Sequence, residues 1–375
     1  MRVLQLLLLL CVFYGASAWP AEALDVKRDD VKEFIAHMHE AYGFKKRPLR
    51  KLLAGAQVQP AILEAMERPA EKAKPWYEYR PIFLNERRIR EGVDFWMAHR
   101  QALETASEHT GVAPEYLAAI LGVETYYGRI TGSYRVLDSL STLAFDYPPR
   151  SKFFRDELEQ FLLLTRDLKV DPRTVKGSYA GAMGAPQFMP SNYRLYAIDA
   201  DADGHVDLWT SWADVCESVG NYLKQFGWNA GEPVLIDAAV TTDKPGSLDG
   251  RTLDLSESVA SLKTKGVTFE SPLPLEAPAL LIAADEPDGT RWRVGFNNFY
   301  VITRYNHSPL YAMAVYELAG ALKQRVTSSA GIPAAGAPAA VISGAAASGT
   351  PVAGTPVAGT PMAGTPVDAA LQPSR

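Results

Sequence analysis

The alternation of hydrophobic and polar positions predicts a mainly α-helical chain that one short β-rich stretch interrupts. From Val26 to about Thr110, and again from about Pro114 to Trp228, hydrophobic residues recur at helical intervals between charged ones. Strand-like runs between Pro, Gly and Asp turns follow at Val234–Val240, Leu280–Ala284 and Arg291–Phe296. The helical pattern returns at Pro309–Val326, so we expect this last helix to complete a core begun before the strands.

One segment of the first helical stretch is predicted to be an ordered, aromatic loop. Residues 74–81 read KPWYEYRP, and their two prolines disfavour a continuous helix.

The patterns divide the chain into six parts. Residues 1–18 have the features of a cleavable signal peptide: one positive charge at Arg2, an apolar run, and small residues at Ala16-Ser17-Ala18. The remaining parts are an N-terminal helical region at 19–110, a central helical core at 111–231, a β-rich insertion at 232–295, the C-terminal part of the core at 296–326, and a tail at 327–375. The tail consists mostly of Ala, Gly, Pro, Ser, Thr and Val, so we expect a disordered spacer that could reach an envelope protein partner.

Charge and cysteine content narrow the class of partner and the compartment. Loss of Arg2 with the signal peptide changes the formal net charge from −5 to −6, which disfavours general binding to nucleic acids and anionic membranes. We expect an exported, periplasmic protein. A lipidated form is less favoured, because Leu10 precedes Cys11 where a lipoprotein signal would have a small residue. Only Cys216 remains after cleavage, so no intramolecular disulfide forms.

Glu124 is the candidate catalytic group. A helix that begins near Pro114 places Leu117, Ile120, Leu121 and Glu124 on one face, which is otherwise apolar. Partial burial there disfavours the charged carboxylate and should raise its pKa, as a proton donor near neutral pH requires. The alternative is a structural Glu hydrogen-bonded at a helix end.

Two uncommon motifs accompany this carboxylate. ETYYG at 124–128 ends the helix with aromatic residues and a glycine, and GAMGAPQFMPS at 181–191 combines small residues with Gln, Phe and Met side chains that suit a sugar-binding groove. A tight loop packed only for shape is the alternative for the second motif.

Taken together, these motifs resemble the lytic murein transglycosylases of the membrane-bound B type and their soluble relatives. The resemblance rests on residues 74–83, 122–128 and 178–191, the acidic loop from Asp199, and YNHS at 305–308, and it spans most of residues 30–325. It implies a lysozyme-like catalytic core with Glu124 as the catalytic residue. It also implies a set of groove residues that hold the sugars or orient the carboxylate: Ser178, Gln187, Phe188, Tyr222, Tyr305 and Asn306. It implies that Arg150 contacts the peptide or lactyl carboxylates of the substrate. The family often has two adjacent arginines at the position of Arg150, whereas here Pro149 precedes it.

The resemblance further implies a reaction that needs one carboxylate. Glu124 protonates the bond between N-acetylmuramic acid and N-acetylglucosamine, and then, as a base, helps the muramoyl C6 hydroxyl to close a 1,6-anhydro ring. Asp138 and Asp146 lack a comparable apolar pattern and are interpreted as a cap or a surface charge. The rival hypotheses are a hydrolytic muramidase, which needs a second base, and a non-catalytic wall-binding protein.

The loop that begins at Asp199 predicts a structural Ca²⁺ site. Residues 199–207, DADADGHVD, match positions 1, 3, 5, 6 and 9 of an EF-hand loop, and oxygen ligands at this spacing favour calcium. The ligands expected from the spacing are Asp199, Asp201, Asp203 and the backbone carbonyl of His205. Position 12 is Thr210, and the resemblance implies that Asp214 supplies the missing carboxylate from the start of the following helix. An acidic turn held by its own hydrogen bonds is the alternative. We expect no organic cofactor.

Overall fold

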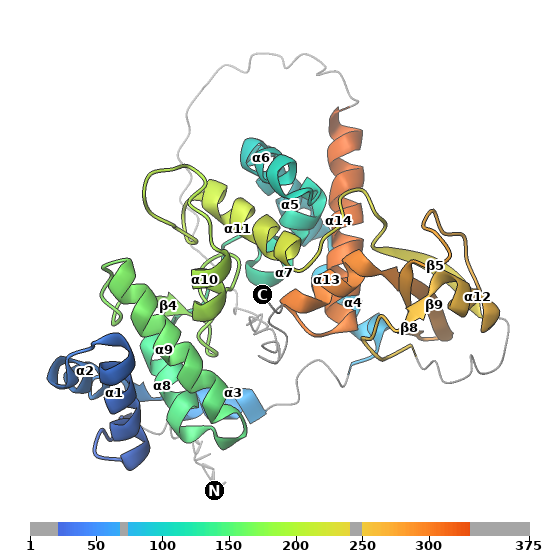
Figure 1. Ribbon diagram of the computed structural model, residues 1–375. Helices are drawn as coiled ribbons and strands as arrows, with labels where there is room; N and C mark the ends of the chain where they lie inside the picture. The colour runs from blue at the N-terminus through green and yellow to red at the C-terminus, as the bar shows by residue number, and fades with distance from the viewer. Residues whose placement is uncertain (1–21, 68–73, 241–249, 331–375) are drawn as a thin grey trace, which may run out of the picture.

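The computed structural model describes residues 22–67, 74–240 and 250–330, and in this part the chain is mainly helical (Figure 1). The helices that precede the site are α1 (Asp29–Tyr42), α2 (Lys46–Leu53), α3 (Pro60–Glu67), α4 (Trp76–Phe83), α5 (Glu86–Ala98) and α6 (Arg100–Thr110). The helices that follow are α7 (Pro114–Thr125), α8 (Val136–Asp146), α9 (Ser151–Asp167), α10 (Pro190–Tyr196), α11 (Trp212–Gln225), α12 (Val259–Thr264), α13 (Asn297–Tyr305) and α14 (Pro309–Ala330). A short 3-10 helix, Pro148–Arg150, joins α8 to α9.

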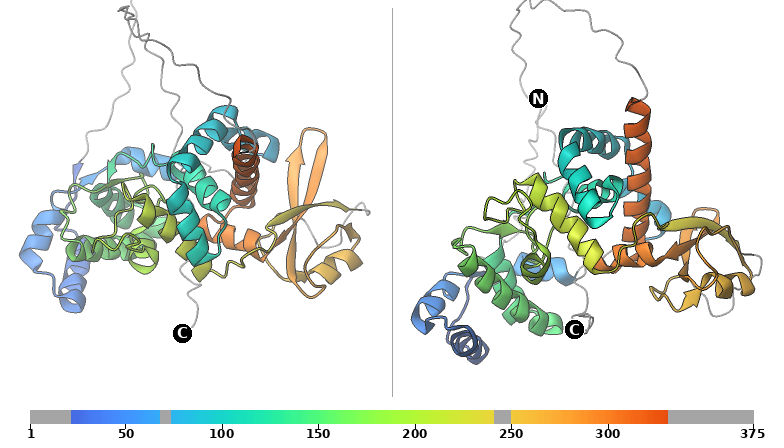
Figure 2. Two further views of the ribbon diagram at one scale, coloured as in Figure 1. Left: turned by 90° about the horizontal axis from the view of Figure 1, so that it is seen from above. Right: turned by 45° about the horizontal axis from the view of Figure 1, so that its top comes forward.

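Helices α1 to α3 lie beside α8 and α9, away from the insertion (Figure 2). Strand β2 (Gln57–Val58) pairs with β1 (Glu22–Ala23) and lies on α8, where the backbone N–H of Gln57 donates to the buried Asp138 carboxylate at 2.9 Å. Arg28 binds Asp146 at 2.5 Å. These contacts give both carboxylates structural partners. Asp138 is only 4% exposed and also pairs with Arg135 at 2.7 Å, so it is a buried ion-pair residue and not the cap or surface charge that the sequence predicted.

Helix α7 lies at the centre of the molecule and packs against α14, α5, α6 and α11. Ten of its twelve residues are buried, because neighbouring helices cover it on several sides. Pro114 occupies its first turn, where the missing N–H costs no hydrogen bond, and the predicted start of this helix is confirmed. The helix that carries Glu124 is therefore held by the core along its length.

The β-rich insertion is a five-stranded sheet in the order β6-β8-β9-β5-β7. The three predicted strands are confirmed as β5 (Leu235–Val240), β8 (Pro278–Glu286) and β9 (Gly289–Phe296); β6 (Glu257–Ser258) and β7 (Val267–Thr268) complete the sheet. One face, with Leu280 and Ile282, joins the main core, while the other, with Val294 and Phe296, covers α12 in a smaller core. The sheet is thereby fixed to the helical body.

Two details of the predicted secondary structure are wrong. Residues 76–83 form helix α4 and not a loop, since Trp76, Tyr79 and Phe83 share one buried helical face. Pro75 only precedes the helix, and Pro81 removes a single backbone hydrogen bond, which the burial of three aromatic rings outweighs.

The second error is at the end of α14, which continues through Ala330 into the predicted tail. The hydroxyl groups of Thr327 and Ser328 donate to the carbonyls of Lys323 and Gln324, one turn earlier. The predicted signal peptide and the rest of the predicted tail lie outside the described residues. In the described ranges, no helix combines the length and the apolar character that crossing a bilayer requires.

Candidate active site

The end of α7 places Glu124 inside the protein and turns the chain sharply after it. Glu124 is 7% exposed. Tyr126 and Tyr127 both adopt left-handed backbone conformations, with φ of 54° and 61°, so the chain leaves the helix at once. Tyr127 then folds back onto the helix, where its ring needs the space left by Gly92 and Gly122: a Cβ at either position would lie within 3 Å of it.

Tyr311 in the first turn of α14 is a direct partner of the Glu124 carboxylate. Its hydroxyl donates to Glu124 Oε1 at 2.6 Å. The ring of Tyr305, at the end of α13, stacks on that of Tyr311 with 6.5 Å between centroids and 10° between planes. Burial, together with the nearby Glu124 charge, raises the pKa of both tyrosines well above the ordinary value, so both hydroxyls stay protonated donors.

The predicted groove motif at residues 181–191 forms a tight loop against the end of α7. Isolated bridges pair Met183 with Gly177 and with Phe188. Thr125, next to Glu124, donates its hydroxyl to the carbonyl of Ala185 at 2.8 Å, and Tyr305 donates to that of Pro186 at 2.6 Å. The loop is therefore tied to α7, which carries the carboxylate, and to the end of α13.

Several predicted groove residues meet in one aromatic cluster. The ring centroid of Phe188 lies 5.6 Å from that of Tyr222 and 6.0 Å from that of Tyr305. Tyr222 donates to the carbonyl of Arg304 at 2.6 Å, which fixes α11 to α13. Through Tyr305 and Tyr311 the cluster reaches Glu124, so the structure brings four predicted site residues together.

The remaining predicted groove residues have different surroundings. Ser178 is fully buried, and its Oγ accepts from the Ala182 N–H at 3.0 Å, so it supports the loop. Gln187 donates to the carbonyls of Thr131 and Gly184, while its buried Oε1 has no hydrogen-bond partner among the described residues. Asn306 is 2% exposed between α13 and α14. Arg150 lies at the α8–α9 junction, with its guanidinium over the ring of Phe153 at 4.5 Å.

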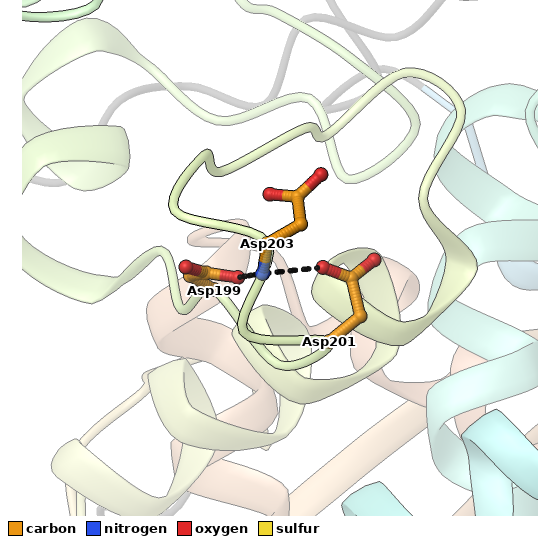
Figure 3. Close-up of side chains that lie close together, drawn as sticks. All are labelled: Asp199, Asp201 and Asp203. Carbon is orange, nitrogen blue, oxygen red and sulfur yellow. Dashed lines mark hydrogen bonds between the residues drawn. The ribbon is translucent and has the colours of Figure 1, made fainter.

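The acidic loop gathers three carboxylates, as Figure 3 shows. Ligand oxygens of Asp199, Asp201 and Asp203 all lie within 4.8 Å of one another. The Asp203 N–H donates to Asp199 and Asp201, and Gly204 takes the φ of +88° that position 6 of such a loop requires. Oxygen donors at this spacing fit a hard divalent cation.

The other two predicted ligands differ in placement. His205 is exposed, and its backbone N–H donates to Asp203 Oδ1 at 2.8 Å. Asp214 lies outside the three-carboxylate cluster and is 1% exposed. Its two oxygens accept the N–H groups of Ala200 and Asp207, each at 2.8 Å, so it holds the two ends of the loop together.

Comparison with known proteins decides the family. The Transglycosylase SLT domain family matches residues 27–320. The chain belongs to this transglycosylase family. It is 40% identical over 302 residues to the membrane-bound lytic murein transglycosylase B of Escherichia coli K12, covering 78% of this chain and 82% of that protein.

Two solved structures are similar along most of their length. The lytic transglycosylase SltB1 of Pseudomonas aeruginosa has a TM-score of 0.77 and 46% identity, covering 80% of this chain and 98% of that one. The Escherichia coli lytic transglycosylase Slt35, solved in complex with calcium, has a TM-score of 0.75 and 38% identity, covering 82% and 97%. The chain is thus a lytic transglycosylase, and its predicted fold class, mainly α with a lysozyme-like core, is confirmed.

Sequence reasoning missed two residues of this transglycosylase. Tyr311 belongs to an apolar helix pattern in the sequence, and only the fold shows that α14 lies beside α7. Glu157 on α9 is a buried carboxylate that accepts the N–H and hydroxyl of Ser191 at the start of α10. Glu157 lies at helical spacing from Phe154 and Phe161, and this spacing could have predicted that it shares their buried face.

We predict that Tyr311→Phe lowers kcat/KM about tenfold, because Glu124 loses a hydrogen bond between a charged group and a buried donor. Tyr127→Phe is the matched control, because it removes a buried hydroxyl that donates to the carbonyl of Arg88 at 3.0 Å and not to the carboxylate. Steady-state cleavage of purified glycan strands measures both. Equal losses in the two variants would contradict a specific role for Tyr311.

We predict that Glu157 makes stability pH-dependent. Burial raises its pKa from 4.5 to about 7, against the opposing effect of the Ser191 hydrogen bonds. Glu157 holds its proton more tightly in the folded state than in the unfolded state, and this difference stabilises the fold. The stabilisation is complete below pH 4.5 and is lost as the pH rises through 7. Over that window the free energy of unfolding of wild type should fall relative to Glu157→Gln by on the order of 3 kcal/mol. Denaturant titrations at several pH values test this, and parallel profiles would refute it.

Proposed function

We propose that this lytic transglycosylase cleaves the β-1,4 bond between N-acetylmuramic acid and N-acetylglucosamine in peptidoglycan, with Glu124 as its sole acid and base and with 1,6-anhydromuramic acid ends as products. The observation that carries the proposal is the setting of Glu124: a buried carboxylate at a helix end, held by Tyr311 and flanked by an aromatic cluster. Aromatic rings of this kind suit the faces of sugar rings.

In the first half of the reaction Glu124 acts as the acid. It donates its proton to the glycosidic oxygen, and the bond from that oxygen to muramoyl C1 breaks. The N-acetyl group of the muramic acid then stabilises the cationic C1 from within the substrate, through an oxazolinium-like intermediate. Burial of Glu124 favours its protonated form before the bond breaks.

In the second half the same residue acts as the base. The carboxylate takes the proton from the muramoyl C6 hydroxyl, whose oxygen attacks C1 and closes the anhydro ring. Glu124 is left protonated, ready for the next strand. While Glu124 is charged, the Tyr311 hydroxyl donates a hydrogen bond to its carboxylate. The proton that Glu124 gives to the glycosidic oxygen is replaced by the one from the C6 hydroxyl, so no water is consumed.

The other buried carboxylates support a one-carboxylate mechanism. Among the described residues these are Glu115, Asp138, Glu157, Asp214 and Glu217, and each already binds a named partner: Lys323, Arg135, Ser191, backbone N–H groups and His109, respectively. A hydrolytic muramidase needs a second free base to activate water.

We assign the groove to the residues around Glu124. Phe188, Tyr222 and Tyr305 provide its aromatic wall, and Gln187 and Asn306 provide amide groups for the N-acetyl and hydroxyl groups of the sugars. Ser178 holds the loop in shape. Arg150 remains a candidate contact for the peptide or lactyl carboxylates of the substrate.

We further propose that the acidic loop binds one structural Ca²⁺. Asp199, Asp201 and Asp203 supply carboxylate oxygens, His205 supplies its carbonyl, and Asp214 closes the loop from beneath. The solved calcium complex of Slt35 supports this assignment. The ion joins the loop to the start of α11, whose Ser211 hydroxyl donates to Asp201, and it does not act on the substrate.

Calcium should therefore stabilise the fold. After treatment with a chelator, saturating Ca²⁺ should raise the melting temperature by about 5 °C, since it binds only the folded loop. Asp203→Asn should abolish the rise, whereas Asp171→Asn, at a surface turn paired with Arg173, should keep it. Scanning calorimetry with and without the ion measures the shift. An unchanged melting temperature in wild type would count against the site.

We place the enzyme in the periplasm, where its substrate lies, on the strength of the signal-peptide pattern at residues 1–18. The tail remains a candidate contact for another envelope protein.

The experiment for the reaction is a product analysis. Purified peptidoglycan digested with the enzyme should release muropeptides that are lighter by one water than hydrolysis products. Hydrated products would make the protein a muramidase, and the absence of any product would favour a non-catalytic wall-binding protein.

A further inference from the structure

Five exposed cations lie next to one another on helix α2 and on the residue before it. They are Lys45, Lys46, Arg47, Arg50 and Lys51, and we call them the basic face. Within the part of the chain that the structure describes, none of the five side chains forms an ion pair or a hydrogen bond. At 3.6 residues per turn, the four on the helix lie within about 140° of arc. In a chain whose formal net charge is −5, they concentrate positive charge on one side of a single helix.

The basic face lowers the stability of the helix that carries it. Lys46 and Arg47 occupy the first turn, where the helix dipole is positive, and this turn contains no acidic residue. Lys45 at the N-cap gives no side-chain hydrogen bond to the free N–H groups. Two pairs of like charges, Lys46 with Arg50 and Arg47 with Lys51, lie four residues apart and repel each other. Stability alone favours acidic residues at this end, so the arrangement points to a binding function.

The surroundings of the basic face favour a hydrated polyanion as its partner. Leu49 and Leu53 of α2 are buried in the core, and Leu52 is half-buried. Among the described residues, the large hydrophobic side chains that are exposed lie elsewhere, and none is on α1 or α2. Helices that bind a lipid surface combine electrostatic attraction with the insertion of apolar side chains. A convex row of cations without such side chains suits a flexible polymer that carries repeated anionic groups.

Peptidoglycan is a polymer of this kind, because its peptide stems carry free carboxylates. The aromatic groove residues near Glu124, which are Phe188, Tyr222 and Tyr305, are uncharged donors and ring faces and leave these carboxylates unmatched. We propose that the basic face binds carboxylates of peptide stems outside the groove and so holds the enzyme on the wall. Figure 1 shows α2 beside α1 at one end of the molecule, away from α7. The contact is therefore with a part of the network other than the bond being cut, and the proposal rests on peptidoglycan being the substrate.

Cosedimentation with intact purified peptidoglycan measures this contact directly. All proteins carry Glu124→Gln, so that cleavage does not dissolve the pellet. Replacing the five residues of the basic face with Gln should weaken binding about tenfold at about 0.05 M salt, because five weak contacts act together. The difference should disappear at about 1 M salt, where exposed charges are screened. The matched control loses the same five charges from exposed ion pairs elsewhere and should bind as the parent does: Gln at Arg100, Arg173, Arg251, Arg291 and Arg325.

A second measurement changes the ligand and keeps the protein intact. When the stem carboxylates are chemically amidated, binding of the parent should fall to the level of the five-Gln variant, and the variant itself should hardly respond. The variant should also melt at or above the temperature of the parent, because the repulsion within α2 is relieved. Equal binding of native and amidated wall, an equal loss in the matched control, a lower melting temperature of the five-Gln variant, or tighter binding of the parent to phosphatidylglycerol vesicles than to the wall would overturn the proposal. Because cosedimentation does not depend on catalysis, failure of the lytic reaction would be seen separately.

Discussion

Glu124→Gln should reduce glycan cleavage by about 10³-fold or more, because the amide can neither donate the proton that breaks the glycosidic bond nor accept the one from the C6 hydroxyl. The loss should appear in kcat more than in KM, since the substitution preserves shape and Tyr311 can still donate to the amide oxygen. Timed release of soluble muropeptides from purified peptidoglycan measures the rate.

The same helix provides the matched control. Glu115 lies on α7 like Glu124, is also 7% exposed, and also binds α14, through Lys323 at 2.8 Å. Glu115→Gln should therefore cost stability but leave kcat within about twofold of wild type, because ordinary ion pairs contribute little to a distant reaction. If both variants lose activity together, α7 would be needed only as a scaffold and the catalytic assignment would fail.

Among glycine-to-alanine substitutions near the site, Gly132→Ala should destabilise the fold most. Gly132 has φ of +98°, and a Cβ would lie 2.1 Å from the carbonyl carbon and oxygen of Gly177, backbone that cannot move aside cheaply. Gly177 pairs with Tyr134 and leads into the Ser178 loop. We expect a loss of about 3 to 5 kcal/mol in the free energy of unfolding, together with loss of activity.

Gly227→Ala isolates the backbone part of that cost. Gly227 has φ of +90°, but no atom lies within 4 Å of the position that a Cβ would take, so only conformational strain of about 1 to 2 kcal/mol should result. Chemical denaturation of both variants gives the comparison. Similar losses at the two positions would mean that the contact with Gly177 is not the source of the effect.

The sequence predicted the features that depend on local pattern. The apolar stripe of α7 and the ETYYG motif both selected Glu124, and the strand runs located β5, β8 and β9. The loop predicted at residues 74–81 was wrong because the two prolines matter less there than the helical spacing of Trp76, Tyr79 and Phe83. The burial of aromatic side chains outweighs local preference in this segment.

Contacts between distant segments could not be predicted in the same way. The hydroxyl of Tyr311 is 187 residues from the carboxylate that it binds, and nothing in its sequence neighbourhood distinguishes it from a core tyrosine. The family resemblance implied that Asp214 is a calcium ligand, whereas in the structure its two oxygens accept backbone N–H groups of the loop.

The most direct test of the central claim is to run the wild-type reaction in water labelled with heavy oxygen and to weigh the new muramic acid ends. If Glu124 is the sole acid and base and the C6 hydroxyl closes the ring, the products are anhydro ends that contain no label. Ends that have gained a labelled hydroxyl would mean that water attacks C1, and the one-carboxylate account of this site would be contradicted.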